Sequence, residues 1–142
     1  AAFLKRCGAD VTRVRKLFRE DAADYLAKAE AIHNAEIFRD FYAISECDSK
    51  NTASPTLVCA QAANDLLNIK GIKASFVLTI YNDMIYISAR SMDEVNVQTI
   101  MEKLGGGGHR SVAGAQIKDG TIDEVKNRVK DVLKEMIERG EI

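Results

Sequence analysis

The sequence lacks most of the features that define a specialised class of protein. Its 142 residues include three cysteines, one proline, two histidines and no tryptophan. Because the cysteines show no CxxC spacing, they argue against a zinc ribbon or a disulfide framework and favour a reducing cytoplasm. No apolar run approaches the roughly 18 residues of a membrane span, and the first residues do not resemble a secretory signal. We therefore expect a soluble, cytoplasmic protein without direct membrane contact.

The charge balance also lacks a strong bias. A formal net charge of -1 and a pI near 6.2 differ from the strongly basic surface that usually grips long nucleic acids. A small anionic ligand remains compatible with such a chain. The length fits one domain, and 46% apolar with 29% charged residues is ordinary for a globular protein that buries a core.

What is present is an alternation of helical and strand patterns. From Asp10, apolar residues recur at helical spacing, and the pattern resumes with Ala22, Leu26, Ala29 and Ile32. Residues 36–46 predict two short strands joined by a turn at Arg39-Asp40. A helix is expected from Ser54-Pro55 to about Ile69, with Gly71 as the left-handed residue that ends it.

The second half continues the same alternation. Residues 72–81 and 84–91 predict a tight hairpin through the two-residue turn Asn82-Asp83. Residues 97–104 predict a helix capped by Gly105, and Thr121 with Glu124 forms a capping box that begins the last helix, which ends near Gly140. The predicted buried stripe of that helix is Ile122, Val125, Val129, Val132 and Met136.

These patterns indicate an α/β fold with a mixed β-sheet flanked by helices and preceded by N-terminal linker helices. The chain opens inside a helix-like stretch, without Met or a capping residue, which predicts a piece of a longer protein. We expect residues 1–34 to be connecting helices from a preceding domain and residues 35–142 to form a ligand-binding domain.

Four consecutive glycines followed by His109 and Arg110 form the segment that folding alone explains least. Glycines permit positive φ and let successive N–H groups converge into a concave nest that suits a phosphate oxygen. Gly106, Gly107, Gly108 and His109 are therefore candidate phosphate ligands, with Arg110 as a further donor. The alternative is a flexible connection beside an exposed, uninvolved histidine. The segment matches neither a Walker loop nor a meaningful dinucleotide motif.

Arg90 is the second candidate for binding phosphate. Strand alternation puts it with Tyr86 and Ser88 on the face opposite Ile85, Ile87 and Ala89, at the end of the strand. Its planar guanidinium fork matches two phosphate oxygens, although a solvated charge at the rim of the sheet is the alternative. Ser91 and Asn96 are candidates either for binding or for capping, and capping is favoured.

No catalytic or metal-binding constellation is visible. Two histidines cannot assemble a nucleophile with a base and an orienting group, and His33 is expected at the surface. The carboxylates lack the His-rich clusters of a two-metal hydrolase. We therefore expect no catalytic residue and no metal site in this chain.

Residues 87–117, with the glycine run, His109 and the small-residue segment Ala113-Gly114-Ala115, resemble the Asp-His-His-associated domain of bacterial phosphoesterases. Residues 88–91 and 94–98 are most similar to the membrane-anchored cyclic di-AMP phosphodiesterases, and the resemblance extends upstream through residues 59–78 to the first residues. It implies a preceding catalytic domain that holds two manganese ions and hydrolyses cyclic di-AMP to linear pApA.

By the same resemblance, Arg90 and His109 contact the substrate phosphate, and the backbone of Gly107 and Gly108 lines the same spot. The implied partners are an adenine dinucleotide and the catalytic domain of the same chain, with a homodimer left open. One alternative is a nanoRNase or 3'-phosphoadenosine phosphatase that uses the same module. Another is a tRNA-binding module without catalysis, like the related C-terminal domain of alanyl-tRNA synthetases.

Overall fold

The computed structural model describes residues 22–48, 50–92 and 94–142, so the helices predicted over residues 1–21 lie outside the described residues. The described chain forms a six-stranded sheet with strand order β1-β2-β3-β4-β6-β5. The strands are β1 (Glu36–Phe38), β2 (Tyr42–Glu46), β3 (Ala74–Tyr81), β4 (Met84–Ser91), β5 (Gly107–Gly108) and β6 (Val112–Ile117). The helices are α3 (Ala22–His33), α4 (Pro55–Leu67), α5 (Val97–Glu102) and α6 (Ile122–Glu138).

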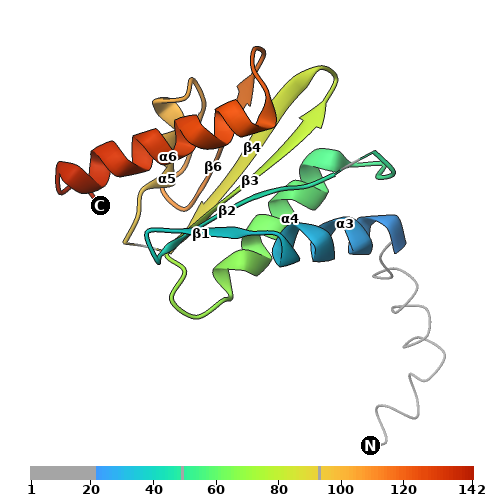
Figure 1. Cartoon of the computed structure of the whole chain (residues 1–142), viewed down its shortest axis with the longest axis horizontal. Helices are drawn as coiled ribbons and strands as arrows, with labels where there is room; N and C mark the ends of the chain where they lie inside the picture. Colours follow the sequence, from blue (N-terminus) through green and yellow to red (C-terminus); the bar gives the residue numbers. More distant parts are fainter. Residues whose placement is uncertain (1–21, 49, 93) are drawn as a thin grey trace, which may run out of the picture.

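The sheet is mixed, as predicted. β2 and β3 run parallel because α4 connects them, whereas the other neighbouring pairs are antiparallel. Helices α3 and α4 lie on one side of the sheet, and α5 and α6 lie on the other (Figure 1). None of the helices in residues 22–48, 50–92 and 94–142 is long and apolar enough to cross a membrane.

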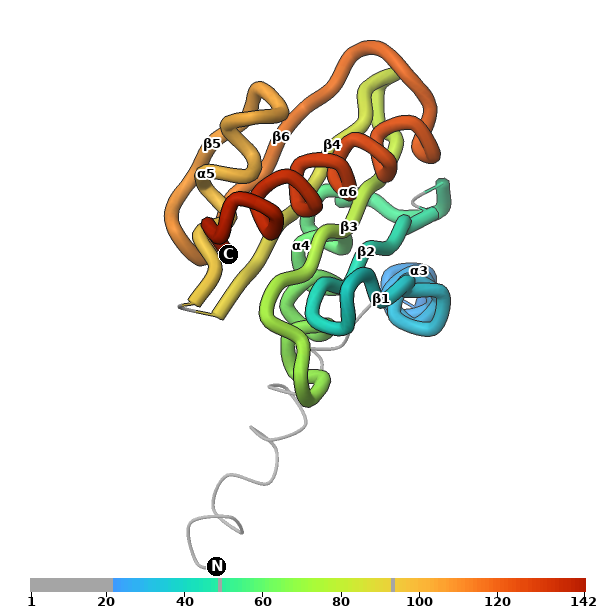
Figure 2. Tube along the Cα trace, turned by 60° about the vertical axis from the view of Figure 1, so that its left-hand side comes forward, coloured from blue at the N-terminus to red at the C-terminus, as the bar shows by residue number. Residues whose placement is uncertain are grey.

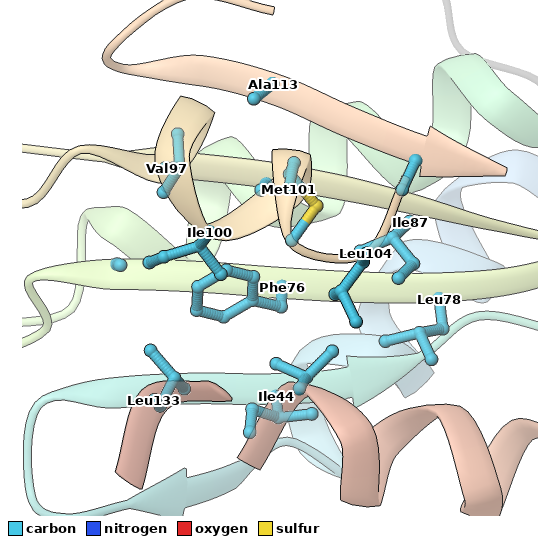
Figure 3. Packing of buried hydrophobic residues seen from close by; sticks show 14 of the residues in the cluster. Ile44, Phe76, Leu78, Ile87, Val97, Ile100, Met101, Leu104, Ala113 and Leu133 are labelled. Atoms are coloured by element: carbon cyan, nitrogen blue, oxygen red, sulfur yellow. The ribbon is translucent and has the colours of Figure 1, made fainter. Parts of the chain in front are cut away.

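The larger core lies between the sheet and α5 with α6. Figure 3 shows the Phe76 ring at its centre, with Ile100 from α5 on one side and Ile44 and Leu133 on the other. All four side chains are fully buried. The predicted stripe of α6 needs one correction, because its buried residues are Val125, Val129, Leu133 and Met136, whereas Ile122 and Val132 are only partly buried.

The smaller core joins α3 and α4 to the other side of the sheet. Its members from α4 include Val58, Cys59, Ala62 and Leu66, and they pack on β2 and β3. The face predicted for α3 is wrong. Ala27 and Ala31 are the buried residues, whereas Leu26 is 60% exposed, because two alanines let the helix approach α4 and β2 closely.

The local turn and cap signals are largely confirmed. Asn82 and Asp83 both have positive φ, as the hairpin turn requires, and so do Arg39 and Asp40 between β1 and β2. Thr121 accepts a hydrogen bond from the Glu124 N–H at the start of α6. Gly71 also has positive φ, but α4 ends earlier, at Leu67, so Gly71 shapes the turn into β3 and does not cap the helix.

The strands β5 and β6 were not predicted. They form a hairpin at the edge of the sheet that is farthest from β1, beside α5 (Figure 2). The glycine run is therefore not a flexible connection, because two of its residues are strand residues paired with Ala113 and Gly114.

Candidate functional site

The two halves of the sheet differ in how they are covered on the α4 side. Helix α4 packs on β3 and β4, and α3 packs on α4 and β2. Among the described residues, neither helix makes a substantial contact with β6 or β5. We call the α4-side surface of β6 and β5, together with the partly exposed side chains of the adjoining strand β4, the open face.

Strand register aligns the residues of the open face in rows that cross the strands. Arg90 pairs with Val112, and the His109 N–H donates to the Val112 carbonyl, at 2.7 Å, so these three residues form one row. The next row on this face consists of Ser88, Gly114 and Gly107. The structure thus brings Arg90 and His109 to the same end of the sheet, with their backbones about 10 Å apart across the strands.

Arg90 is half-buried and held in a fixed orientation. Its Nη1 donates to the Ala89 carbonyl at 2.8 Å and to the Ala113 carbonyl at 3.5 Å. Burial lowers the pKa of the guanidinium, and the nearby Cys59 opposes that shift. Because the pKa of arginine starts so high, the side chain stays charged at neutral pH. The site therefore contains an oriented cation in a partly dehydrated place, where an anion is attracted more strongly than at an exposed rim.

Three of the four glycines are required by the fold. Gly105 has a φ of 86°, and the bonds from Gly106 N–H to the Met101 carbonyl and from Gly105 N–H to the Glu102 carbonyl form a Schellman cap for α5. A Cβ on Gly106 would lie 2.1 Å from the Gly114 carbonyl oxygen. A Cβ on Gly108, where φ is 142°, would lie 2.6 Å from the Ala113 Cα. These contacts explain most of the run by close packing, a reason that the sequence did not reveal.

The same contacts modify the predicted cradle. The Gly106 N–H is used by the helix cap and the His109 N–H by the β5–β6 hairpin, so these two groups do not converge into a nest. Gly107 remains, because it has no positive φ and a Cβ on it would meet no atom within 4 Å. Nothing in the described chain requires glycine at position 107, and its missing side chain leaves room above the open face.

The three further candidates lie close by but differ in exposure and in their contacts. The Ser91 side chain is buried, and its hydroxyl donates to the Val95 carbonyl at 2.6 Å. It therefore supports the loop before α5 and is not directed at solvent. Asn96 caps α5 by accepting from the N–H groups of Gln98 and Thr99, as favoured from the sequence. Arg110 is exposed at the hairpin turn, and its carbonyl accepts from the Val97 N–H.

The remaining polar groups do not form a metal centre. His109 and His33 are both exposed and lie on different elements. Within residues 22–48, 50–92 and 94–142, no group of three or more His, Cys, Asp or Glu side chains is arranged to hold a metal ion. The described part of the chain therefore does not offer the ligand set that two catalytic metal ions require.

A cavity of about 580 Å³ adjoins the open face at the end that is farther from Arg90. Its lining includes Tyr86, Gly105, Gly106, Gly114, Gln116 and Lys118. We did not predict this cavity, because β6 was not recognised as a strand and its register with β4 is a property of the folded sheet. The small-residue segment 113–115 was the only signal in the sequence that the strands approach closely here.

A mixed six-stranded sheet flanked by helices defines a domain of the α/β class. Residues 41–138 match the model of the DHHA1 domain family, and the chain belongs to this family. It is 40% identical over 141 residues to the cyclic-di-AMP phosphodiesterase GdpP of Geobacillus thermodenitrificans. That match covers 99% of this chain but 21% of the relative, so the chain spans about a fifth of the length of that relative.

Solved structures show the same fold at low sequence identity. An exopolyphosphatase-related protein from Bacteroides fragilis has a TM-score of 0.74 and 20% identity, and the match covers 86% of this chain and 37% of that chain. The C-Ala domain of Aquifex aeolicus alanyl-tRNA synthetase has a TM-score of 0.51 and 21% identity, covering 70% of this chain and 96% of that domain. These two likenesses concern the fold alone.

Proposed function

We propose that this chain is the substrate-binding domain of a phosphodiesterase and that it holds a nucleotide phosphate between Arg90 and His109. The observation that carries this proposal is the row that places the two residues on either side of Val112, at the same end of the sheet. The Gly107 position adds room there, because no atom of the described chain fills the space that a side chain would occupy.

The chemistry of the row suits an anion. Arginine presents a planar set of N–H donors that matches two phosphate oxygens, and histidine adds a directed donor. The carbonyls of Ala89 and Ala113 fix the guanidinium before a ligand arrives. Fixed donors of this kind stabilise charge that develops on the phosphate as it reacts, since they need no reorganisation at that moment.

We further propose cyclic di-AMP as the substrate and linear pApA as the product. The Geobacillus relative, whose match covers nearly the whole of this chain, is named as a cyclic-di-AMP phosphodiesterase. The two manganese ions and the residues that hold them would belong to a preceding catalytic domain. The described residues offer no such ligand cluster. In this arrangement the open face would close over the nucleotide on the cytoplasmic side of the membrane, and a homodimer remains open.

The experiment compares matched variants of the full-length protein that contains this chain. Arg90→Ala or His109→Ala should lower kcat/KM for cyclic di-AMP by roughly ten- to a thousand-fold, because an interaction with the reacting phosphate is lost. Arg128→Ala and His33→Ala are the controls, since both residues are exposed on helices outside the open face. Unchanged kinetics in both test variants would refute the phosphate contact.

Substrate choice and the place of catalysis need separate measurements. Linear pApA and 3'-phosphoadenosine 5'-phosphate, assayed beside cyclic di-AMP, distinguish the proposed activity from that of a nanoRNase or phosphoadenosine phosphatase. A gel shift with tRNA tests the non-catalytic alternative. The 142-residue chain alone, supplied with manganese, should not hydrolyse cyclic di-AMP, and turnover proportional to its concentration would show that the catalytic metals bind here.

A further inference from the structure

The cavity beside the open face is a second binding feature, and the proposed phosphate contact does not use it. Its polar lining consists of Tyr86 from β4 with Gln116 and Lys118 from β6 and the following loop, and its remaining lining is apolar or backbone: Met84, Ile87, Ala115, Gly105, Gly106 and Gly114. Its volume is about 580 Å³, within the usual range for small-molecule sites. Arg90 and His109 do not line the cavity. A ligand whose phosphate they hold would therefore reach the cavity with a different part of the ligand molecule.

The strand register fixes the order of features along the open face. Tyr86 pairs with Gln116, and this row lies four residues along β4 from the row of Arg90, or roughly 13 Å. Between them lies the row of Ser88, Gly114 and Gly107, where two of three residues have no side chain. A ligand can therefore lie over the two glycines, beside Ser88, between the row of Arg90 and the cavity.

The side chains at the cavity are those that recognise a nucleobase. Tyr86 is partly exposed and its ring is steadied by Tyr81, with ring centroids 6.0 Å apart. An aromatic ring offers a stacking surface to any base, whereas the amide of Gln116 offers one donor and one acceptor that match the edge of adenine. Lys118 adds a cation at the far end, suited to a second phosphate.

We propose that this cavity is a purine subsite in which Tyr86 stacks on the base and Gln116 contacts its edge. The base belongs to a nucleotide whose phosphate occupies the row of Arg90 and His109, and the ribose lies over Gly114 and Gly107, beside the part of β4 that α4 covers. The inference deepens the proposed function and rests on it. It gives the domain a role in choosing the base as well as in holding the phosphate.

The test uses ¹⁵N-labelled protein of the 142-residue chain, titrated with ribose 5-phosphate, AMP and GMP. Ribose 5-phosphate should shift the amide signals of Arg90 and His109 and of the adjoining Gly107 and Gly114, and leave those of Tyr86 and Gln116 unchanged. AMP should shift these and also the signals of Tyr86 and Gln116. Tyr86→Leu should weaken AMP binding by roughly 5- to 100-fold and leave ribose 5-phosphate binding unchanged, because only a stacked base is lost.

One further variant and two controls complete the design. Gln116→Ala should reduce any preference for AMP over GMP while it leaves the phosphate signals intact. Tyr25→Leu and Gln98→Ala are the matched controls, because both residues lie on helices away from the open face.

The outcomes separate the two proposals. If AMP and ribose 5-phosphate give the same shifts and the same affinity, the purine subsite is refuted while the phosphate site stands. If neither compound perturbs Arg90 or His109, the proposed function fails, and the subsite fails with it. An unchanged AMP affinity of the Tyr86→Leu variant, with AMP still shifting the amide signal of residue 86, would also overturn the stacking contact.

Discussion

The two faces of the sheet are built from different kinds of residue. The face toward α5 and α6 is a continuous layer of large apolar side chains, including Ile44, Phe76 and Leu78. The face toward α4 contains small and polar residues. Ser75 and Thr79 are fully buried there, and their hydroxyls donate to the carbonyls of Ala63 and Cys47 at 2.6 and 2.9 Å. Under α4 this pattern allows close helix packing, and beyond α4 it leaves the open face.

The contrast assigns different tasks to the two faces. Burial of large hydrocarbon side chains is the main stabilising contribution to a fold, so the covered face is where truncation should cost most. The open face buries less within this chain, because Val112 is 48% exposed, Arg90 is half-buried and the Gly107 position meets open space. Substitutions there should therefore change binding more than stability. The following predictions test this division, from the largest expected effect to the smallest.

The largest effect is expected from Phe76→Ala on the covered face. The ring is fully buried among Ile44, Ile100 and Leu133, so its removal leaves a cavity in the core. The free energy of unfolding should fall by about 3–5 kcal/mol, measured by urea denaturation. Val112→Ala is the control on the open face, where the side chain is 48% exposed and the loss should stay within about 0.5 kcal/mol. Similar losses in the two variants would contradict the division between the faces.

A smaller effect on stability is expected from alanine substitutions at two adjacent glycines, and it should differ between the two positions. In Gly106→Ala the new Cβ meets the Gly114 carbonyl oxygen and the Ala115 Cα, so the β5–β6 hairpin must shift. The cost should be roughly 1–3 kcal/mol of stability. In Gly107→Ala the Cβ enters open space, and stability should change by less than about 1 kcal/mol.

Of these two glycine variants, Gly107→Ala should cost the less stability but should affect phosphate binding. Gly107→Ala should weaken ribose 5-phosphate binding although the domain stays stable, because its methyl group occupies the space above the open face. Thermal unfolding and the same NMR titration measure both properties. If Gly107→Ala binds the phosphate as the unchanged chain does, Gly107 does not contribute to the site.

The sequence predicted those features that depend on neighbours along the chain. The Asn82-Asp83 turn, the Thr121 cap and the alternation of β4 follow from local backbone preferences, and the structure confirms them. The strand Val112–Ile117 was missed because alanine and glycine have low strand propensity and give no apolar alternation. Its place is set by packing between β4 and β5, which no local pattern describes.

The same distinction between local features and features set by strand packing applies to the candidate site. Arg90 and His109 were selected by their side-chain chemistry and by a family resemblance, but their common row depends on the strand order β4-β6-β5. The glycines were interpreted as a cradle because their contacts with β6 are not visible in a linear sequence. Tyr86, Gln116 and Lys118 were missed as a group for the same reason, since only the register brings them to one cavity.

The smallest effect concerns Cys59, which lies in the covered half of the α4 side next to the open face. The thiol is fully buried, with its Sγ 2.9 Å from the Val77 carbonyl oxygen, and burial raises its pKa from 9.0 to about 12. Because the raised pKa favours the neutral thiol in the folded state, its contribution to stability is complete below about pH 9. That contribution is lost as the pH rises from 9 toward 12, at a rate on the order of 1 kcal/mol per pH unit.

Cys59→Ala removes this titration and leaves every other ionisable group in place. The unfolding free energies of the two proteins, measured by urea denaturation between pH 7 and pH 10.5, should differ by a constant amount up to about pH 9. Above that pH the unchanged protein should lose stability faster, so that the difference narrows. Parallel curves over the whole range would mean that the thiol is not held in a dry environment and that water reaches the α4 side as far as Cys59. In that case the boundary between the covered and open halves of this face would lie nearer to β3 than the packing of α4 indicates.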